Sequence, residues 1–252
     1  MEDHMEYFSF KNIDSTGIAR AIYTPKGLGN WSIGDPGALA NFTLLGKEFG
    51  ISPETMVRTD QKHTADVRVI TAAEAGEGVV RPVTRMECDG IMTDVPGIML
   101  CTVEADCTPV YLLDPVRRAA AMIHSGWRGT ASKITDNAIR MMEETYGTDP
   151  ADILAAIGPC ICRDCYEVSE DLIPPFRESF GESAAGSFFT AKDNGKYLLD
   201  LKAAVKKTLT LAGVHERNIE DSGYCTCHSG KFYSWRGDKD PSVRMLTAIW
   251  LI

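Results

Sequence analysis

The sequence lacks the features of secreted, membrane-spanning and nucleic-acid-binding proteins. Its first ten residues, MEDHMEYFSF, contain no basic segment followed by an apolar one, so we expect no signal peptide. No apolar run reaches the roughly 18 residues that a membrane span needs. The formal net charge of -9 disfavours nucleic acid and anionic membranes as partners, because both are negatively charged. We therefore predict a soluble cytoplasmic protein, in which an anionic substrate requires a local basic pocket.

Linkers and internal repeats are also absent. No segment rich in Pro, Gly and Ser divides the 252 residues, and a chain of this length can bury a large core. We therefore predict one domain spanning residues 1–252. Cysteine, by contrast, is frequent. In a chain this long that lacks a signal peptide, eight cysteines indicate reduced thiols or metal ligands more than a disulfide scaffold.

The stretch of residues 88–130 holds three short apolar runs, at 97–103, 110–113 and 119–123. Each run is bounded by turn residues and is too short for an independent helix. These runs predict buried strands.

Reactive side chains lie where these predicted strands stop. Cys107 lies in an Ala-Asp-Cys-Thr-Pro turn, and His124 opens a His-Ser-Gly-Trp-Arg-Gly turn. Pro109 supports the first turn, because proline has no N–H for a strand ladder. A strand end holds a side chain rigidly yet leaves it accessible, so we expect a functional site here.

Helical periodicity alternates with the strand signals. Four segments have the spacing or composition of helices, and Gly50 and Gly147 are expected to end the first two: they cover residues 36–50, 130–147, 171–180 and 201–212. Residues 74–85 are expected to form a surface loop, and 243–251 can be a helix or a strand. Because tight turns also join consecutive strands, the pattern favours a mixed α+β layered fold over a doubly wound parallel sheet.

His63, Cys107 and His124 are candidate metal ligands. All three lie at predicted strand ends and together offer two imidazoles and one thiolate. Catalytic zinc typically has three protein ligands and an open fourth position, and a mixture of Cys and His is an accepted set. The alternative is that these are core histidines with satisfied hydrogen bonds and a buried thiol.

The segment from Ser125 to Gly129 is a candidate anion site. Its glycines, including Gly126, allow backbone N–H groups to converge before a predicted helix, and Arg128 adds a fork of donors suited to phosphate. The alternative is a glycine-rich turn with Arg128 in a surface salt bridge. The segment, which also contains Trp127, matches neither a Walker loop nor a Rossmann fingerprint.

Other polar residues are expected near these strand ends. Arg58 and Gln61 approach from the His63 strand, and Arg236 comes from the far end of the chain. Either arginine can clamp a phosphate or a sugar, or can simply be solvated. Asp106 can orient a metal-bound histidine, or can cap backbone N–H groups in its turn.

Two further groups of thiols follow other predicted turns: Cys160, Cys162 and Cys165, then Cys225, Cys227 and His228. They are able to form a structural zinc or an iron–sulfur site. Because no clean pair of C-x-x-C motifs is present, we interpret them as packing thiols that line the same cleft and predict no second metal.

Several motifs resemble one known family. DGIMTDVPG, ADCTPVYLLDP, HSGWRGT, IGPCI with CYEV, and YSWRGD with RMLTAIWL resemble the YfiH/LACC1 family (DUF152), also called the polyphenol oxidase (laccase) family. The resemblance runs from about Gln61 to Ile252. It implies an α/β/β/α sandwich and a metal, usually zinc, at the His63, Cys107 and His124 positions. It also implies phosphorolysis of adenosine, inosine and 5′-methylthioadenosine, and deamination of adenosine.

We therefore predict a zinc-dependent purine nucleoside phosphorylase and adenosine deaminase, a monomer or weak homodimer whose partners are a nucleoside and phosphate. Cys107, His124 and Arg128 are the predicted catalytic residues. Seven residues are predicted to bind substrate: Arg58, Gln61, Gly126, Trp127, Arg128, Cys160 and Arg236. The sequence leaves open the preferred nucleoside, the balance of the two reactions, the general acid and the metal in the cell.

Three alternatives remain. A His-Cys-His set can hold copper, as in a polyphenol oxidase, but a multinuclear copper centre needs more imidazoles than His4, His215 and His228 supply. Cys107 with His124 as its base would suit a thiol hydrolase or deamidase. The third alternative is a non-enzymatic zinc-binding module linked to cell-wall precursor editing.

Overall fold

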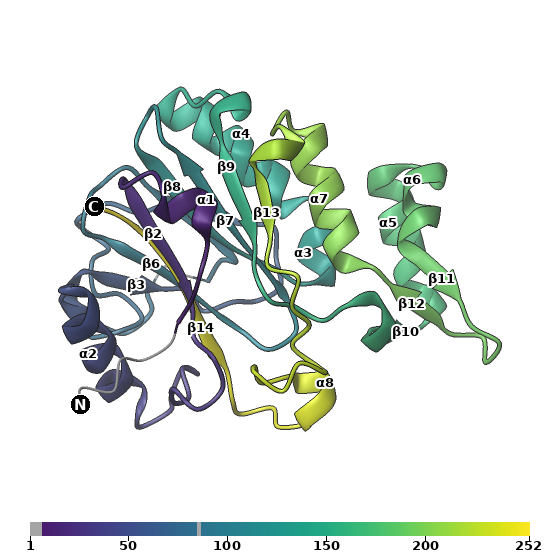
Figure 1. The fold of residues 1–252 in the computed structure, drawn as a ribbon, viewed down its shortest axis with the longest axis horizontal. Helices are drawn as coiled ribbons and strands as arrows, with labels where there is room; N and C mark the ends of the chain where they lie inside the picture. Colours follow the sequence, from purple (N-terminus) through teal and green to yellow (C-terminus); the bar gives the residue numbers. More distant parts are fainter. Residues whose placement is uncertain (1–6, 85–86) are drawn as a thin grey trace.

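Two mixed β-sheets pack face to face in the computed structural model, which describes residues 7–84 and 87–252 (Figure 1). The first sheet has five strands in the spatial order β1 (Phe8–Ser9), β2 (Ala19–Tyr23), β14 (Met245–Leu251), β6 (Met99–Glu104) and β3 (Met56–Arg58). The second has six, in the order β13 (Ile219–Asp221), β9 (Leu154–Ile157), β7 (Thr108–Asp114), β8 (Ala119–Ser125), β5 (Gly90–Thr93) and β4 (Val67–Val69). The main core lies between them and joins Leu100 and Ile249 of the first sheet to Tyr111 and Met122 of the second.

Helices cover the outer face of each sheet. α2 (Ala38–Phe49) packs on the first sheet through Phe42 and Leu45. α4 (Ile134–Tyr146) and α7 (Leu201–Leu211) pack on the second. This layering confirms the predicted α+β fold with an α/β/β/α arrangement.

A smaller lobe projects beside the second sheet, on the right of Figure 1. It contains a three-stranded sheet of β10 (Glu167–Val168), β12 (Tyr197–Leu199) and β11 (Phe189–Ala191), with α5 (Ile173–Phe180) and α6 (Glu182–Phe188). The short helices are α1 (Lys11–Asp14), α3 (Trp127–Ala131) and α8 (Trp235–Asp238). The lobe has its own apolar cluster, which Ala131 of α3 joins. The lobe thereby packs against the segment that follows His124.

The apolar runs of the sequence became the central strands. Every residue of β7 and β8 is buried, because these strands carry neighbours on both sides and both faces are covered. Gly50 and Gly147 end α2 and α4 in the left-handed conformation, with φ of 68° and 70°, as predicted. The ambiguous segment 243–251 forms a strand, β14, at the centre of the first sheet.

The prediction that Pro109 belongs to a turn is wrong. Pro109 lies inside β7, opposite His124 of β8. The Pro109 carbonyl accepts a hydrogen bond from Gly158 N, and His124 N donates to Asp89 O. This pair therefore exchanges no backbone hydrogen bonds, so the missing proline N–H leaves no ladder bond unmade between these strands.

Two predictions fall partly outside the described residues. Residues 1–6 hold His4 and most of the segment inspected for a signal peptide, and Arg85 ends the predicted loop 74–85. Among residues 7–84 and 87–252, no helix has the length and apolar character needed to cross a membrane.

A candidate metal centre between two cavities

The three predicted metal ligands lie together. The ligand atoms of His63, Cys107 and His124 are all within 4.8 Å of one another. Cys107 Sγ lies 3.8 Å from His63 Nε2, and the two imidazole ring centroids are 4.9 Å apart. His63 comes from the segment between β3 and β4, Cys107 from the turn between β6 and β7, and His124 from β8. Strands of both sheets therefore contribute to one cluster.

Asp89, just before β5, holds the cluster in place. Its Oδ1 accepts hydrogen bonds from His124 Nδ1 at 2.8 Å and from the backbone N–H of His63 at 3.0 Å. Burial opposes ionisation of this carboxyl, but the hydrogen bond and charge of His124 prevail and lower the pKa of Asp89 to about 2. Because Nδ1 of His124 is occupied, its Nε2 is left to face the cluster.

Asp106 does not have the orienting role that the sequence analysis considered for it. Its Oδ1 accepts from the Thr226 hydroxyl at 2.6 Å, and its Oδ2 accepts from the backbone N–H of Arg236 at 2.7 Å. Asp106 thus ties the Cys107 turn to the Thr226 loop and to the start of α8. The carboxylate that orients a histidine is Asp89.

Gly126 leaves the space that the cluster needs. A Cβ at this position would lie 2.8 Å from His63 Cδ2 and 3.2 Å from Cys107 Sγ. Both distances are shorter than an ordinary carbon contact, so a larger residue would displace the ligands. In the fold, Gly126 therefore allows the backbone to lie close to His63 and Cys107.

The donor atoms of the cluster suit a bound cation. Burial opposes ionisation of Cys107, but the charges and hydrogen bonds of the two imidazoles lower its pKa to about 6. Burial raises the pKa of Glu104 to about 8, although the charge of His124 acts in the opposite direction. Glu104 Oε2 lies 3.8 Å from His124 Nε2 and has no hydrogen-bond partner among the described residues. A buried Glu104 oxygen without a partner in the described part of the chain, beside two imidazoles and one thiolate, fits a zinc ion held by His63, Cys107 and His124.

Two cavities meet at this cluster, with volumes of about 540 and 490 Å³. His63, Cys107 and Arg244 line both. The first cavity also contains Gln61, whose amide is hydrogen-bonded to the backbone of Val103. Both volumes lie within the range of about 300–1,000 Å³ that is usual for small-molecule sites.

Comparison with known proteins identifies the family. Residues 7–252 match the family model described as multi-copper polyphenol oxidoreductase laccase. The chain belongs to this family. A purine nucleoside phosphorylase of Streptomyces coelicolor is 36% identical over 236 residues, which cover 93% of this chain and 91% of the relative. A protein named adenosine deaminase RL5, from an unknown prokaryotic organism, is 30% identical over 215 residues, covering 82% of this chain and 79% of the relative.

The fold of this laccase-family chain also matches a solved relative. The crystal structure of the hypothetical protein YfiH of Bacillus licheniformis superposes with a TM-score of 0.91 at 29% identity, covering 100% of this chain and 98% of that one. The resemblance noted in the sequence is confirmed. The expectation of an enzyme is confirmed as well, since the curated relatives are named as purine nucleoside phosphorylases and an adenosine deaminase.

The predicted substrate-binding residues separate into two groups. Trp127 and Arg236 line the second cavity, and Gln61 lines the first. Arg58 and Cys160 are buried outside the residues that line these cavities. The Arg58 guanidinium donates to the Trp31 carbonyl at 2.7 Å and lies against the Phe42 ring.

Arg128 is exposed and stacks on the Trp127 ring, with its Cζ 4.4 Å from the ring centroid. It lies outside the residues that line the two cavities. Its stacking partner Trp127 does line the second cavity. A direct role for Arg128 in phosphate binding or catalysis stays a prediction.

Arg244 and Tyr166 line the cavities of this laccase-family chain but were not among the predicted site residues. Arg244 directly precedes β14 and lines both cavities. Its position at a strand end is the same signal that pointed to Cys107 and His124. Tyr166 lines the second cavity, and the Arg236 guanidinium lies 5.4 Å from the centre of its ring. Burial raises the pKa of Tyr166, so its hydroxyl stays protonated.

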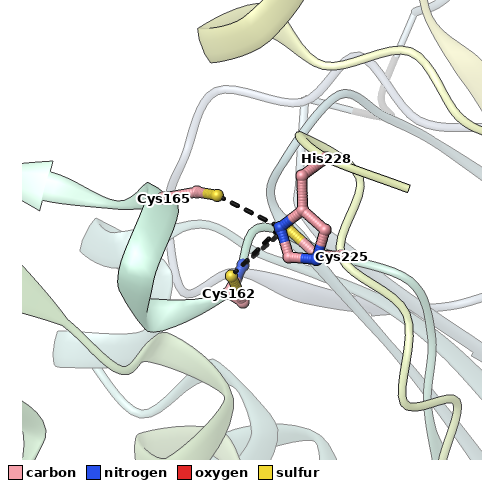
Figure 2. A group of neighbouring side chains, drawn as sticks. All are labelled: Cys162, Cys165, Cys225 and His228. Atoms are coloured by element: carbon pink, nitrogen blue, oxygen red, sulfur yellow. Dashed lines mark hydrogen bonds between the residues drawn. The ribbon is translucent and has the colours of Figure 1, made fainter. Parts of the chain in front are cut away.

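Four of the remaining metal-ligating side chains form a second cluster, away from the cleft that they were expected to line. Cys162, Cys165, Cys225 and His228 have ligand atoms within 4.8 Å of one another, whereas Cys160 and Cys227 are not in the group (Figure 2). None of the four lines either cavity described above. The overlooked signal was the spacing, because Cys162 and Cys165 form a C-x-x-C motif and Cys225 and His228 form C-x-x-H.

Proposed function

We propose that this chain is a zinc-dependent purine nucleoside enzyme that catalyses phosphorolysis of adenosine, inosine or 5′-methylthioadenosine, and deamination of adenosine. It would act as a monomer or weak homodimer. The observation that carries this proposal is the second cavity, whose lining combines His63 and Cys107 with aromatic and arginine side chains. The names of the relatives agree with this substrate class.

The cavity offers a separate group for each part of such substrates. Trp127 and Tyr166 present flat apolar surfaces that suit a purine ring. Arg236 and Arg244 supply guanidinium groups for phosphate, which arginine binds through paired hydrogen bonds. The Arg236 side chain is held in place by a hydrogen bond, in which its Nη1 donates to the Glu167 carbonyl at 2.9 Å. The pocket thus supplies the local positive charge that a chain of net charge -9 needs for an anionic substrate.

The metal ligands and their neighbours support the chemistry. His63, Cys107 and His124 would hold zinc, which supplies Lewis-acid polarisation and lowers the pKa of a water molecule at its open position. Asp89 keeps His124 in the tautomer that presents Nε2. In the metal-free protein burial raises the pKa of Glu104 to about 8, so its carboxyl holds a proton at neutral pH beside that ring.

The first test combines zinc content with adenosine turnover, with and without phosphate. Phosphate-dependent release of adenine supports phosphorolysis, and phosphate-independent formation of inosine supports deamination. His63→Ala, Cys107→Ala and His124→Ala should each lose one zinc ion and at least about 10²-fold in kcat/KM, because the metal site is incomplete. Full turnover in all three variants would refute the assigned centre.

Arg244→Gln tests the phosphate pocket. The Arg244 guanidinium donates to the carbonyl of its own neighbour, Val243, at 2.8 Å. We expect the KM for phosphate to rise about 10- to 100-fold, because a charged hydrogen bond contributes about 1.5–3 kcal/mol. Arg140→Gln, on the exposed surface of α4, is the control and should leave this KM unchanged. An unchanged phosphate KM in Arg244→Gln would contradict the assignment.

A thiol hydrolase or deamidase is the second candidate. The lowered pKa of Cys107, with His124 held by Asp89, gives the order of nucleophile, base and orienting carboxylate that such enzymes use. Zinc bound to Cys107 would protect the thiol from alkylation. Rapid modification of Cys107 by iodoacetamide in the protein as purified, at a rate that added zinc does not change, would favour this candidate.

The copper oxidase and the non-enzymatic module have less support. Among the described residues, the candidate metal groups contain three histidines, with His63 and His124 in one cluster and His228 in the other. A multinuclear copper centre needs more imidazoles in one place. Turnover of nucleosides would in turn separate an enzyme from a zinc-binding module involved in cell-wall precursor editing.

A further inference from the structure

The second cluster joins two loops that leave one end of the second sheet. Strands β9 and β13 are parallel neighbours, so their following loops emerge side by side. The pairing continues beyond the strands. Ser222 N donates to Ile157 O at 2.9 Å, and Thr226 N donates to Cys160 O at 3.1 Å. Cys162 and Cys165 therefore lie on one loop, and Cys225 and His228 lie on the loop beside it.

The four side chains converge on one point (Figure 2). A tight turn, in which Cys165 N donates to Cys162 O at 3.1 Å, brings the first two thiols to the same side. His228 Nδ1 lies 3.3 Å from Cys165 Sγ and 3.7 Å from Cys162 Sγ. Ligand atoms held tetrahedrally by one zinc ion lie about 3.5–3.8 Å apart, which matches this spacing.

Hydrogen bonds alone would not satisfy this arrangement. The neutral imidazole of His228 has a single acceptor nitrogen, yet two thiols approach the same Nδ1 atom. Cys225 Sγ accepts from the backbone N–H of Cys162 at 3.3 Å. A backbone donor directed at sulfur stabilises a thiolate, which is the form that binds metal.

We propose that Cys162, Cys165, Cys225 and His228 bind a second zinc ion that is structural. Three thiolates and one imidazole complete a closed Cys₃His site with no position for substrate. The paired C-x-x-C and C-x-x-H spacings are typical of such sites. An iron–sulfur cluster is disfavoured, because those clusters use four thiolates or two histidines on one iron.

The proposed ion would stabilise one wall of the second cavity. The first loop continues from Cys165 directly into Tyr166, and its Ile161 also lines that cavity. In the second loop the Thr226 hydroxyl donates to Asp106, the neighbour of Cys107. The ion therefore ties the loop that lines the cavity to the loop whose Thr226 holds the lining residue Asp106, whatever reaction occurs there.

The test measures zinc per chain by mass spectrometry on the whole protein, purified with a reductant. We expect two ions in the wild type and in Cys227→Ser, a nearby thiol outside the cluster. His63→Ala, Cys165→Ser and His228→Asn should each retain one. The exposed position of His228 allows its replacement without disturbing the core.

Cobalt substitution identifies which site is filled. The ion in His63→Ala should have about three times the thiolate charge-transfer absorption of the ion in Cys165→Ser, because three thiolates replace one. A single ion in the wild type that is lost in His63→Ala would overturn the proposal. A Cys162–Cys165 disulfide in the reduced preparation would also overturn it. Neither result depends on nucleoside turnover.

Discussion

Asp89 is a single buried carboxylate that organises the metal centre. It accepts hydrogen bonds from the backbone N–H groups of Lys62, His63 and Thr64, from the Thr64 hydroxyl and from His124 Nδ1. His63 has φ of 60°, a left-handed backbone conformation that costs about 1–2 kcal/mol outside glycine. The bonds to Asp89 hold the His63 turn in that conformation. One side chain thus places two of the three ligands.

Asp89→Asn should weaken zinc binding at this centre about 10- to 100-fold, because an amide nitrogen cannot accept the hydrogen bonds that the second oxygen now accepts. Titration with a chelator of known affinity measures the effect. Asp66→Asn, an exposed carboxylate in the segment that carries His63, is the matched control. Equal zinc affinity in both variants would show that Asp89 does not orient the ligands.

Glu104 makes the stability of the metal-free protein depend on pH. Burial raises its pKa to about 8 in the folded state, above its usual value near 4.3 in an unfolded chain. Its contribution is therefore complete at acidic pH, below the unfolded pKa. It is lost as the pH rises from the unfolded pKa toward 8, because the unfolded chain releases this proton to water while the folded state still holds it.

Glu104→Gln should remove the loss of stability that Glu104 causes as the pH rises. Between about pH 5 and pH 8 the free energy of unfolding of the variant should rise relative to wild type, by at most about 1.4 kcal/mol for each pH unit. Urea unfolding of the metal-free proteins measures the difference. Glu143→Gln, on the exposed surface of α4, should follow the wild type. A constant difference across this range would contradict the raised pKa.

At the scale of elements, the start of α3 must approach two turns very closely. Gly126 precedes this helix, and its missing side chain leaves room for His63 and Cys107. Thr130 of α3 holds the Gly126 backbone in this position. Its hydroxyl donates to the Gly126 carbonyl at 2.9 Å and lies 2.8 Å from Ser125 Oγ. The glycine is therefore required by packing between elements.

Gly126→Ala should lower kcat/KM by about 10²-fold, because displacing catalytic groups by about 1 Å has effects of this size. Gly186→Ala in α6 is the control, since a Cβ there would meet nothing within 4 Å. That control should keep full activity and can gain stability, because alanine is the better helix former. Full activity in Gly126→Ala would mean that the ligands can move without consequence.

At the scale of the molecule, metal binding should be coupled to folding. The first centre draws ligands from segments attached to both sheets, and these segments meet only in the folded chain. A ligand that binds only the folded state stabilises it by about 2.7 kcal/mol at 100 times its Kd. The whole fold is therefore expected to gain stability from zinc.

Zinc added to the chelator-stripped protein at about 100 times its Kd should raise Tm by roughly 5–10 °C for each site that it fills, since each kcal/mol shifts Tm by about 2–4 °C in a chain of this size. Differential scanning calorimetry measures the shift. Magnesium, which prefers oxygen ligands, is the control ion and should have little effect. An equal Tm with and without zinc would show that the clusters do not bind it.

The sequence by itself determined the local structure and much of the chemistry. Continuous apolar runs predicted β6, β7 and β8, and glycines predicted the ends of α2 and α4, because burial and backbone conformation depend on nearby residues. The α+β class followed from these elements. The His63, Cys107 and His124 set could be proposed from residue type and strand ends, and the family resemblance strengthened it.

Only the tertiary structure decided which distant residues meet. Cys162 and His228 are 66 positions apart, and their contact depends on the parallel pairing of β9 with β13. Asp89 rather than Asp106 orients His124, because β5 and β8 are neighbours in the sheet. No local pattern encodes such pairings. They arise from the packing of the whole chain, which brings the ends of particular strands together.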